Sequence, residues 1–169
     1  MTPGGPCPTS STQPAAILST DLSPEGLSPG STDAATIFVG RQDTAIGTGP
    51  AYLILLSANT AGDVALYRTT PAVSGYHEID YIQVSAPNYR GPLLTRAHQL
   101  DGTHDIQWGP SIDPSFTKLV GIATDDVALP HGWVTFPSSI FVPGPGCYGF
   151  QIDGTSFSEV IVFPAIAPP

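Results

Sequence analysis

Two loops of the chain combine histidine with aspartate, residue types that bind transition metals through imidazole nitrogen and carboxylate oxygen. The candidate ligands are His77 in one loop and Asp101, His104 and Asp105 in the other. Neither spacing matches a known metal motif, and the two loops would have to meet in space. A histidine beside an acid in a polar loop is more commonly solvated, so we expect no bound metal and no other cofactor.

A small hydrolase or a metal-dependent enzyme is the alternative interpretation of this region. His98, His104 and Asp105 would supply the histidine and the acid that acid–base or metal-assisted chemistry requires. The chain has no G-x-S-x-G sequence, which would position a nucleophilic serine. The stretch Gly47–Pro50 lacks the lysine and the further glycines of a phosphate-binding loop. The residues therefore favour a non-enzymatic protein over an enzyme.

Three residues could instead contact a binding partner. Tyr89 and Arg90 belong to the turn-forming sequence APNYRGP, where we expect an exposed aromatic side chain. Exposed aromatic rings stack on sugars or anchor protein partners, so the expected partner is a protein or a glycan. Trp108 is the third candidate contact unless its ring fills the core, and Trp133 in the sequence GWVTF is expected in the core.

The charge of the chain excludes some partners. Five Lys and Arg residues stand against fourteen Asp and Glu residues, which gives a formal net charge of −9. So few cations cannot build a surface that follows the phosphates of a nucleic acid, and an anionic membrane surface is disfavoured for the same reason. The longest apolar run, AYLILL at 51–56, is far shorter than the roughly 20 residues that a membrane-spanning helix needs.

The composition and the hydrophobic pattern indicate an all-β protein. Pro (19) and Gly (18) are abundant, which breaks helices and suits short strands joined by turns. From residue 34 onward, apolar β-forming stretches alternate with turn-forming residues, as in a β-sandwich. The expected strands are 35–40, 51–58, 63–70, 78–86, 92–100, 118–124, 133–136, 139–142, 147–152 and 158–163. We expect an extended arm over residues 1–33 and a sandwich domain over residues 34–169.

The stretch from 147 to 163 contains the clearest hairpin signal. Tyr148, Phe150 and Ile152 alternate with small or polar residues, which predicts a strand with one apolar face. The pair Asp153–Gly154 follows, and a second apolar stretch begins at Phe157. Asp-Gly between two such stretches predicts a β-hairpin, because glycine accepts the positive φ of a tight turn.

Three segments carry a resemblance to a known group of proteins. They are CP at 7–8, RGPLLTRAHQLDG at 90–102 and GWVTFPSSIFVPGPGCYGFQIDGTSFSEVIVF at 132–163. Together they resemble uncharacterised secreted bacterial β-sandwich proteins with an N-terminal Cys-Pro and a C-terminal Pro-Gly-Cys-aromatic hairpin. The resemblance implies an exported, immunoglobulin-like antiparallel β-sandwich and a disulfide between Cys7 and Cys147. It implies no activity.

The two cysteines are also informative on their own. No lysine, arginine or histidine lies near Cys7 or Cys147 in the sequence to lower the pKa of a reactive thiol. No C-x-x-C pair is present for a redox centre or a zinc site. A disulfide is therefore the favoured interpretation, with lipid attachment at Cys7 as the rival one.

A disulfide would place the protein outside the cytoplasm, because exported proteins are oxidised and cytosolic ones are not. We expect an extracytoplasmic protein, secreted or tethered to the envelope, whose signal sequence is not part of these residues. The expected function is that of a non-enzymatic binding or structural module of the cell envelope or the secreted milieu. The sequence leaves the ligand and the oligomeric state open.

Overall fold

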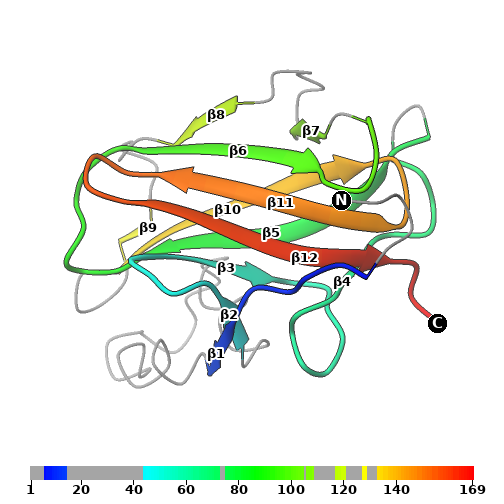
Figure 1. The fold of residues 1–169 in the computed structure, drawn as a ribbon, viewed down its shortest axis with the longest axis horizontal. Helices are drawn as coiled ribbons and strands as arrows, with labels where there is room; N and C mark the ends of the chain where they lie inside the picture. The colour runs from blue at the N-terminus through cyan, green and yellow to red at the C-terminus, as the bar shows by residue number, and fades with distance from the viewer. Residues whose placement is uncertain are drawn as a thin grey trace, which may run out of the picture.

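The computed structural model describes residues 6–14, 44–72, 75–104, 106–108, 117–120, 127–128 and 133–169. Within these ranges every regular element is a β-strand, and the strands form two packed sheets (Figure 1). This confirms the prediction of an all-β protein. The structure contains no helix, among the described residues, that is long and apolar enough to cross a membrane.

The larger sheet is built around two long central strands, and its described strand pairs are all antiparallel. In spatial order its strands are β1 (Thr12–Pro14), β2 (Thr44–Ile46), β3 (Ala51–Leu55), β5 (His77–Ser85), β10 (Val134–Val142) and β7 (Gln107–Trp108), and β9 (Val127–Ala128) also pairs with β10.

The smaller sheet contains the predicted hairpin. Its spatial order is β4 (Ala65–Leu66), β12 (Ser158–Ile166), β11 (Gly146–Asp153), β6 (Leu93–Gln99) and β8 (Thr117–Val120). Strands β11 and β12 pair from Gly146–Ala165 to Asp153–Ser158, and the Gly154 N–H donates to the carbonyl of Phe157 across the turn at 2.9 Å. Among the described strands of this sheet, β4 alone runs parallel to its neighbour, β12. The predicted hairpin is confirmed, but its turn comprises the four residues Gly154–Phe157, and Gly154 does not have the positive φ on which the prediction was based.

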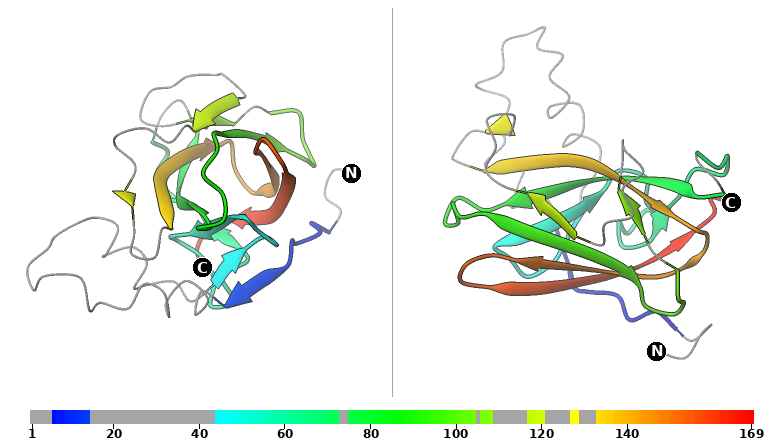
Figure 2. Two further views of the ribbon diagram at one scale, coloured as in Figure 1. Left: turned by 90° about the vertical axis from the view of Figure 1, so that its left-hand side faces the viewer. Right: turned by 90° about the horizontal axis from the view of Figure 1, so that it is seen from above.

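The core lies between the two sheets, which surround it when the molecule is viewed end-on (Figure 2). Aromatic rings from both sheets meet at its centre. Phe150 of β11 packs edge-to-face against Tyr81 of β5 and Trp108 of β7, with ring centroids 5.3 and 5.6 Å apart. Such geometry contributes about 0.5–1.5 kcal/mol per pair beyond the burial of apolar area. Trp108 therefore fills the core.

A second apolar cluster lies on the opposite face of the larger sheet. Ile54, Ile82 and Val84 alternate along β3 and β5 with the residues of the inter-sheet core, so they point to the other side of the sheet. Trp133 joins this cluster, and its ring centroid lies 6.1 Å from that of Tyr52. Trp133 is buried as predicted, but on the outer side of the larger sheet rather than between the sheets.

The described part of the N-terminal arm, residues 6–14, connects the edges of the two sheets. Ser10 N–H donates to the carbonyl of Val162 in β12 at 2.9 Å, and Gly47 N–H donates to the carbonyl of Ser11 at 3.0 Å. Cys7 is disulfide-bonded to Cys147 at the start of β11, with 5.3 Å between the Cα atoms. The predicted disulfide is confirmed. The expected boundary between residues 33 and 34 lies outside the described residues.

Candidate functional site

Two of the four candidate metal ligands, His77 and Asp101, make other contacts. His77 lies on β5, with Nδ1 2.8 Å from the carbonyl oxygen of Arg68 and its ring stacked at a tilt on Tyr67. Asp101 accepts hydrogen bonds from Cys147 N–H at 3.0 Å and from Gln99 Nε2 at 3.2 Å, so its carboxylate holds the segment around the disulfide. The part of the chain that the structure describes contains no group of three or more potential ligands.

In the described part of the structure, the residues of the alternative enzyme site do not form a common site. His98 is exposed on β6, and His104 is exposed in the loop that follows this strand. Asp105 lies outside the described residues. His98 does line a surface pocket, but its neighbours there are an arginine, a glutamine and apolar residues.

The prediction that Tyr89 is exposed is wrong: the residue is buried, and only 7% of its surface is exposed. The Tyr89 hydroxyl donates to the carbonyl of Pro92 at 2.6 Å and accepts from Thr155 N–H at 2.9 Å. Its ring packs edge-to-face on Phe157 at 5.0 Å. The turn after β5 is thereby fastened to the β11–β12 turn. A Cβ at Gly154 would come within 2.9 Å of the Tyr89 ring, so this position excludes a larger residue.

The other two predicted partner contacts differ in exposure. Arg90 is exposed in the turn beside Tyr89, as a contact residue would be. Trp108 is only 4% exposed and its ring is part of the inter-sheet core, so the structure places it where a partner does not reach. Of the three candidates, only Arg90 presents its side chain to solvent.

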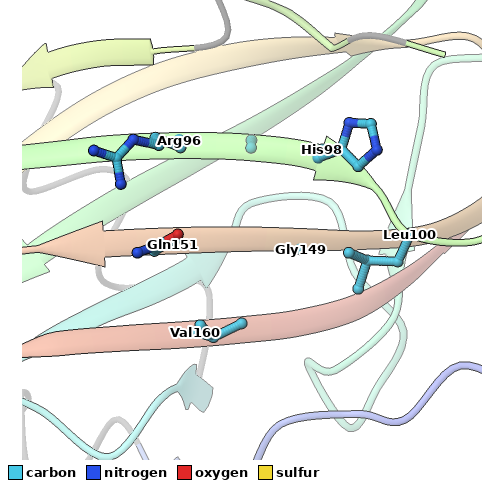
Figure 3. Close-up of a pocket in the computed structure, with 7 residues that line it drawn as sticks. Arg96, His98, Leu100, Gly149, Gln151 and Val160 are labelled. Atoms are coloured by element: carbon cyan, nitrogen blue, oxygen red, sulfur yellow. The ribbon is translucent and has the colours of Figure 1, made fainter. Parts of the chain in front are cut away.

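A pocket on the outer side of the smaller sheet forms the best candidate site (Figure 3). It has a volume of about 360 Å³, and its walls come from β6, β11 and β12 together with Leu100. We call it the β6–β11–β12 pocket; its lining residues are Arg96, Ala97, His98, Leu100, Gly149, Gln151 and Val160. Figure 3 shows the side chains of Arg96 and His98 on one strand and that of Val160 two strands away.

The strand register explains why a hollow exists here. Gly149 of β11 lies opposite His98 on one side and Val162 on the other. Because glycine has no side chain, the side chain of Leu100 packs directly over Gly149, and a Cβ at this position would come within 3.1 Å of Leu100 carbons. Gln151, two residues further along, lies between Arg96 and Val160. Val160 is 58% exposed, an unusual position for a large apolar side chain on this surface.

The polar rim of the pocket is held by one carboxylate. Asp153 forms an ion pair with Arg96 at 2.5 Å and accepts hydrogen bonds from Ser158 at 2.6 Å and from Gln151 at 2.9 Å. The hydrogen bond from Ser158, the one from Gln151 and the charge of Arg96 hold the pKa of Asp153 below its ordinary value. Arg96 and Gln151 are therefore oriented at the rim before any ligand arrives.

The pocket combines an apolar floor with cationic and amide groups at its edge. Such a site can hold an apolar side chain while Arg96 meets a carboxylate beside it. This pocket is difficult to predict from the sequence, because Gly149 and Val160 become neighbours only through pairing of β11 with β12, and His98 joins them only through pairing of β6 with β11. The sequence signals that could have indicated it are Gly149 in the middle of an apolar strand and Val160 at a solvent-facing position of the alternating strand that follows.

A comparison of the chain with known protein families, curated proteins and solved structures finds no match.

Proposed function

We propose that the protein is an immunoglobulin-like antiparallel sandwich. The order of the central strands supports this: β3-β5-β10 in one sheet and β12-β11-β6 in the other follow the A-B-E and G-F-C orders of that fold. The edge strands β7 and β8 take the D and C′ positions, but in the reverse of the usual order along the chain. In this assignment β11 and β12 are the last two strands, and the β6–β11–β12 pocket lies on the outer side of the G-F-C sheet. The disulfide between the arm and β11 is a departure from the usual pairing between the two sheets.

We further propose that the protein is a non-enzymatic binding module that recognises a protein partner through the β6–β11–β12 pocket. The partner presents an apolar side chain next to an Asp or Glu residue. The observation that carries this proposal is the exposed Val160 beside the floor at Gly149, with Arg96 fixed at the rim by Asp153. A protein is favoured over a glycan because none of the seven described lining residues is Trp, Tyr or Phe, and sugars are commonly held on the rings of these residues.

The proposed location is extracytoplasmic, either secreted or tethered at the cell envelope. Support comes from the disulfide between Cys7 and Cys147, which closes a separation of 140 residues and would be reduced in most cytosolic environments. The charge of −9 is compatible with a module that binds another protein and does not bind nucleic acid.

The binding proposal can be tested without a known partner. A library of random linear peptides is selected against the purified protein, and enriched peptides are synthesised and titrated calorimetrically. We expect enrichment of a large apolar residue next to Asp or Glu. Val160→Asp should weaken the binding of such peptides at least about tenfold, as expected for a central contact residue.

Ile166→Asp provides the matched control, because Ile166 is also an exposed apolar residue of β12, at 44%, but does not line the pocket. This variant should bind the peptides as the wild type does. Binding that survives Val160→Asp, or that is lost equally in both variants, would overturn the proposal. A selection that enriches no apolar–acidic pair would do the same.

A further inference from the structure

One edge of β12 carries backbone groups without a partner strand. Val162 binds Ser10 of the arm through both its N–H and its carbonyl, so these groups point away from β11. Backbone groups of alternate residues in a strand point the same way, and those of Ser158 and Val160 therefore also face this edge. Strand β4 pairs only with Ala165 and Ile166. Among the described residues, no strand covers the edge from 158 to 160.

A second pocket of about 410 Å³ lies along this part of the edge. Its walls are Phe157–Val160 of the hairpin, Thr9–Ser11 of the arm and Gly47–Gly49 of the β2–β3 loop. Gly47 and Gly49 have φ angles of 127° and 87°, and neither adds a side chain to the opening. The space beside the edge is therefore bounded mainly by backbone and by hydroxyl groups.

Glu159 is the single charged residue that lines this second pocket. Its side chain is only 9% exposed, and Oε1 accepts hydrogen bonds from Thr48, one from the backbone N–H and one from the hydroxyl. Oε2 is buried and has no hydrogen-bond partner among the described residues. A buried charged oxygen without a partner is unfavourable, so an entering donor with a positive charge would be stabilised here.

The arm shows that this edge accepts an added extended segment. The Ser10 N–H donates to the Val162 carbonyl as a neighbouring strand would, whereas the Val162 N–H donates to the Ser10 side-chain oxygen at 2.8 Å. The next residue, Ser11, accepts a hydrogen bond from Gly47 of the other sheet. The Ser10 hydroxyl also donates to the carbonyl of Val160 at 3.3 Å, and the arm leaves the edge at this point. Beyond Ser10, the described residues provide no strand partner for the Val160 N–H or for the backbone groups of Ser158.

We propose that this edge binds a short extended segment of a partner protein that carries a lysine. The segment adds as a strand beside Ser158–Val160, and its lysine stands opposite Glu159 as a cross-strand charge pair. This site goes beyond the β6–β11–β12 pocket: it uses the edge of β12 and the side chain of Glu159, whereas the first pocket uses the outer face of the sheet.

The test uses three acetylated and amidated tripeptides: Val-Lys-Val, the same peptide with norleucine in place of lysine, and Val-Lys-Val with both valine nitrogens methylated. Binding is followed by backbone amide shifts of the ¹⁵N-labelled full chain. We expect Val-Lys-Val to bind saturably and to shift the amides of Ser158–Val160. The norleucine peptide should bind about tenfold more weakly, as for loss of a hydrogen bond to a charged group, and the methylated peptide should not bind.

Glu159→Gln keeps the acceptor for Thr48 and removes the charge, so it should abolish the preference for lysine over norleucine. Glu78→Gln is the matched control, because Glu78 does not line this pocket and instead forms an ion pair with Arg68 at 3.1 Å. The Glu78→Gln variant should keep the wild-type preference for the lysine peptide over the norleucine peptide. Equal binding of the lysine and norleucine peptides to the wild type, binding of the methylated peptide, or no binding of any peptide would each overturn the proposal.

Discussion

Replacing Tyr89 by phenylalanine removes a single oxygen atom from the contact between the turn after β5 and the β11–β12 turn. That oxygen donates to Pro92 at 2.6 Å and accepts from Thr155 at 2.9 Å, while the ring on Phe157 is left in place. Because Pro92 and Thr155 are exposed, water replaces the lost partners, and each hydrogen bond is worth its net contribution of about 1 kcal/mol. We expect a loss of about 2 kcal/mol in the free energy of unfolding.

Urea unfolding monitored by tryptophan fluorescence measures this loss, and the slope of the transition should not change, because the surface exposed on unfolding is the same. Tyr76→Phe is the matched control: the hydroxyl of Tyr76 has no described hydrogen bond, so its removal should cost less than about 0.5 kcal/mol. A loss for Tyr89→Phe as small as that of the control would refute the reasoning, since it would mean that Tyr89 behaves as an ordinary exposed side chain.

Three further predictions concern the disulfide and the titratable groups. Cys7→Ser with Cys147→Ser should lower stability by up to about 5 kcal/mol from loop entropy, measured by urea unfolding, and mass spectrometry of unreduced wild type should find the 7–147 cross-link and no free thiol. The pKa of Asp153 is lower in the folded than in the unfolded state, so Asp153 stabilises the fold above its unfolded pKa, and this stabilisation is lost as the pH falls through its folded pKa. Asp153→Asn should therefore make the free energy of unfolding less dependent on pH in the acid range. Burial raises the pKa of Tyr81 and Tyr148 well above 10, so stability should fall above pH 10 by about 1.4 kcal/mol per pH unit for each, and Tyr148→Phe should make this fall less steep.

Local patterns in the sequence were sufficient for the hairpin and for the fold class. The alternation of Tyr148, Phe150 and Ile152 predicts which side of β11 faces the core, and the chain turns directly after Asp153, as predicted. Gly154 does not have the positive φ of a tight Asp-Gly turn, because the turn is four residues long. The link between Cys7 and Cys147 was also accessible, because with two cysteines only one pairing exists within the chain.

The continuity of β10 was not predicted. The sequence suggested two strands, 133–136 and 139–142, separated at Pro137, yet one strand runs from Val134 to Val142. Strand β9 pairs with Val134 and Thr135, and β7 pairs with Ile140 and Phe141. Pro137 falls between these two short partners, where the side away from β5 has no described neighbour. A proline without an N–H is tolerated at such a position.

The environment of Tyr89 and the two pockets depend on contacts between distant parts of the chain. Tyr89 is buried because Thr155, 66 positions away, offers its N–H to the phenol. The β6–β11–β12 pocket forms because Gly149 is paired with His98. A residue's own type and its immediate neighbours contain no information on such partners, so exposure in a turn was the natural expectation for Tyr89.

The disulfide also determines how the molecule carries mechanical load. A pull between the residue before Cys7 and the last residue passes through the S–S bond to Cys147 and then along β11 and β12, while residues 8–146 form a closed covalent loop outside the force path. Cys147 lies opposite Pro164, so both ends of the loaded hairpin are pulled from the same side. Its cross-strand hydrogen bonds would open one after another, whereas the larger sheet would stay folded until the hairpin had separated.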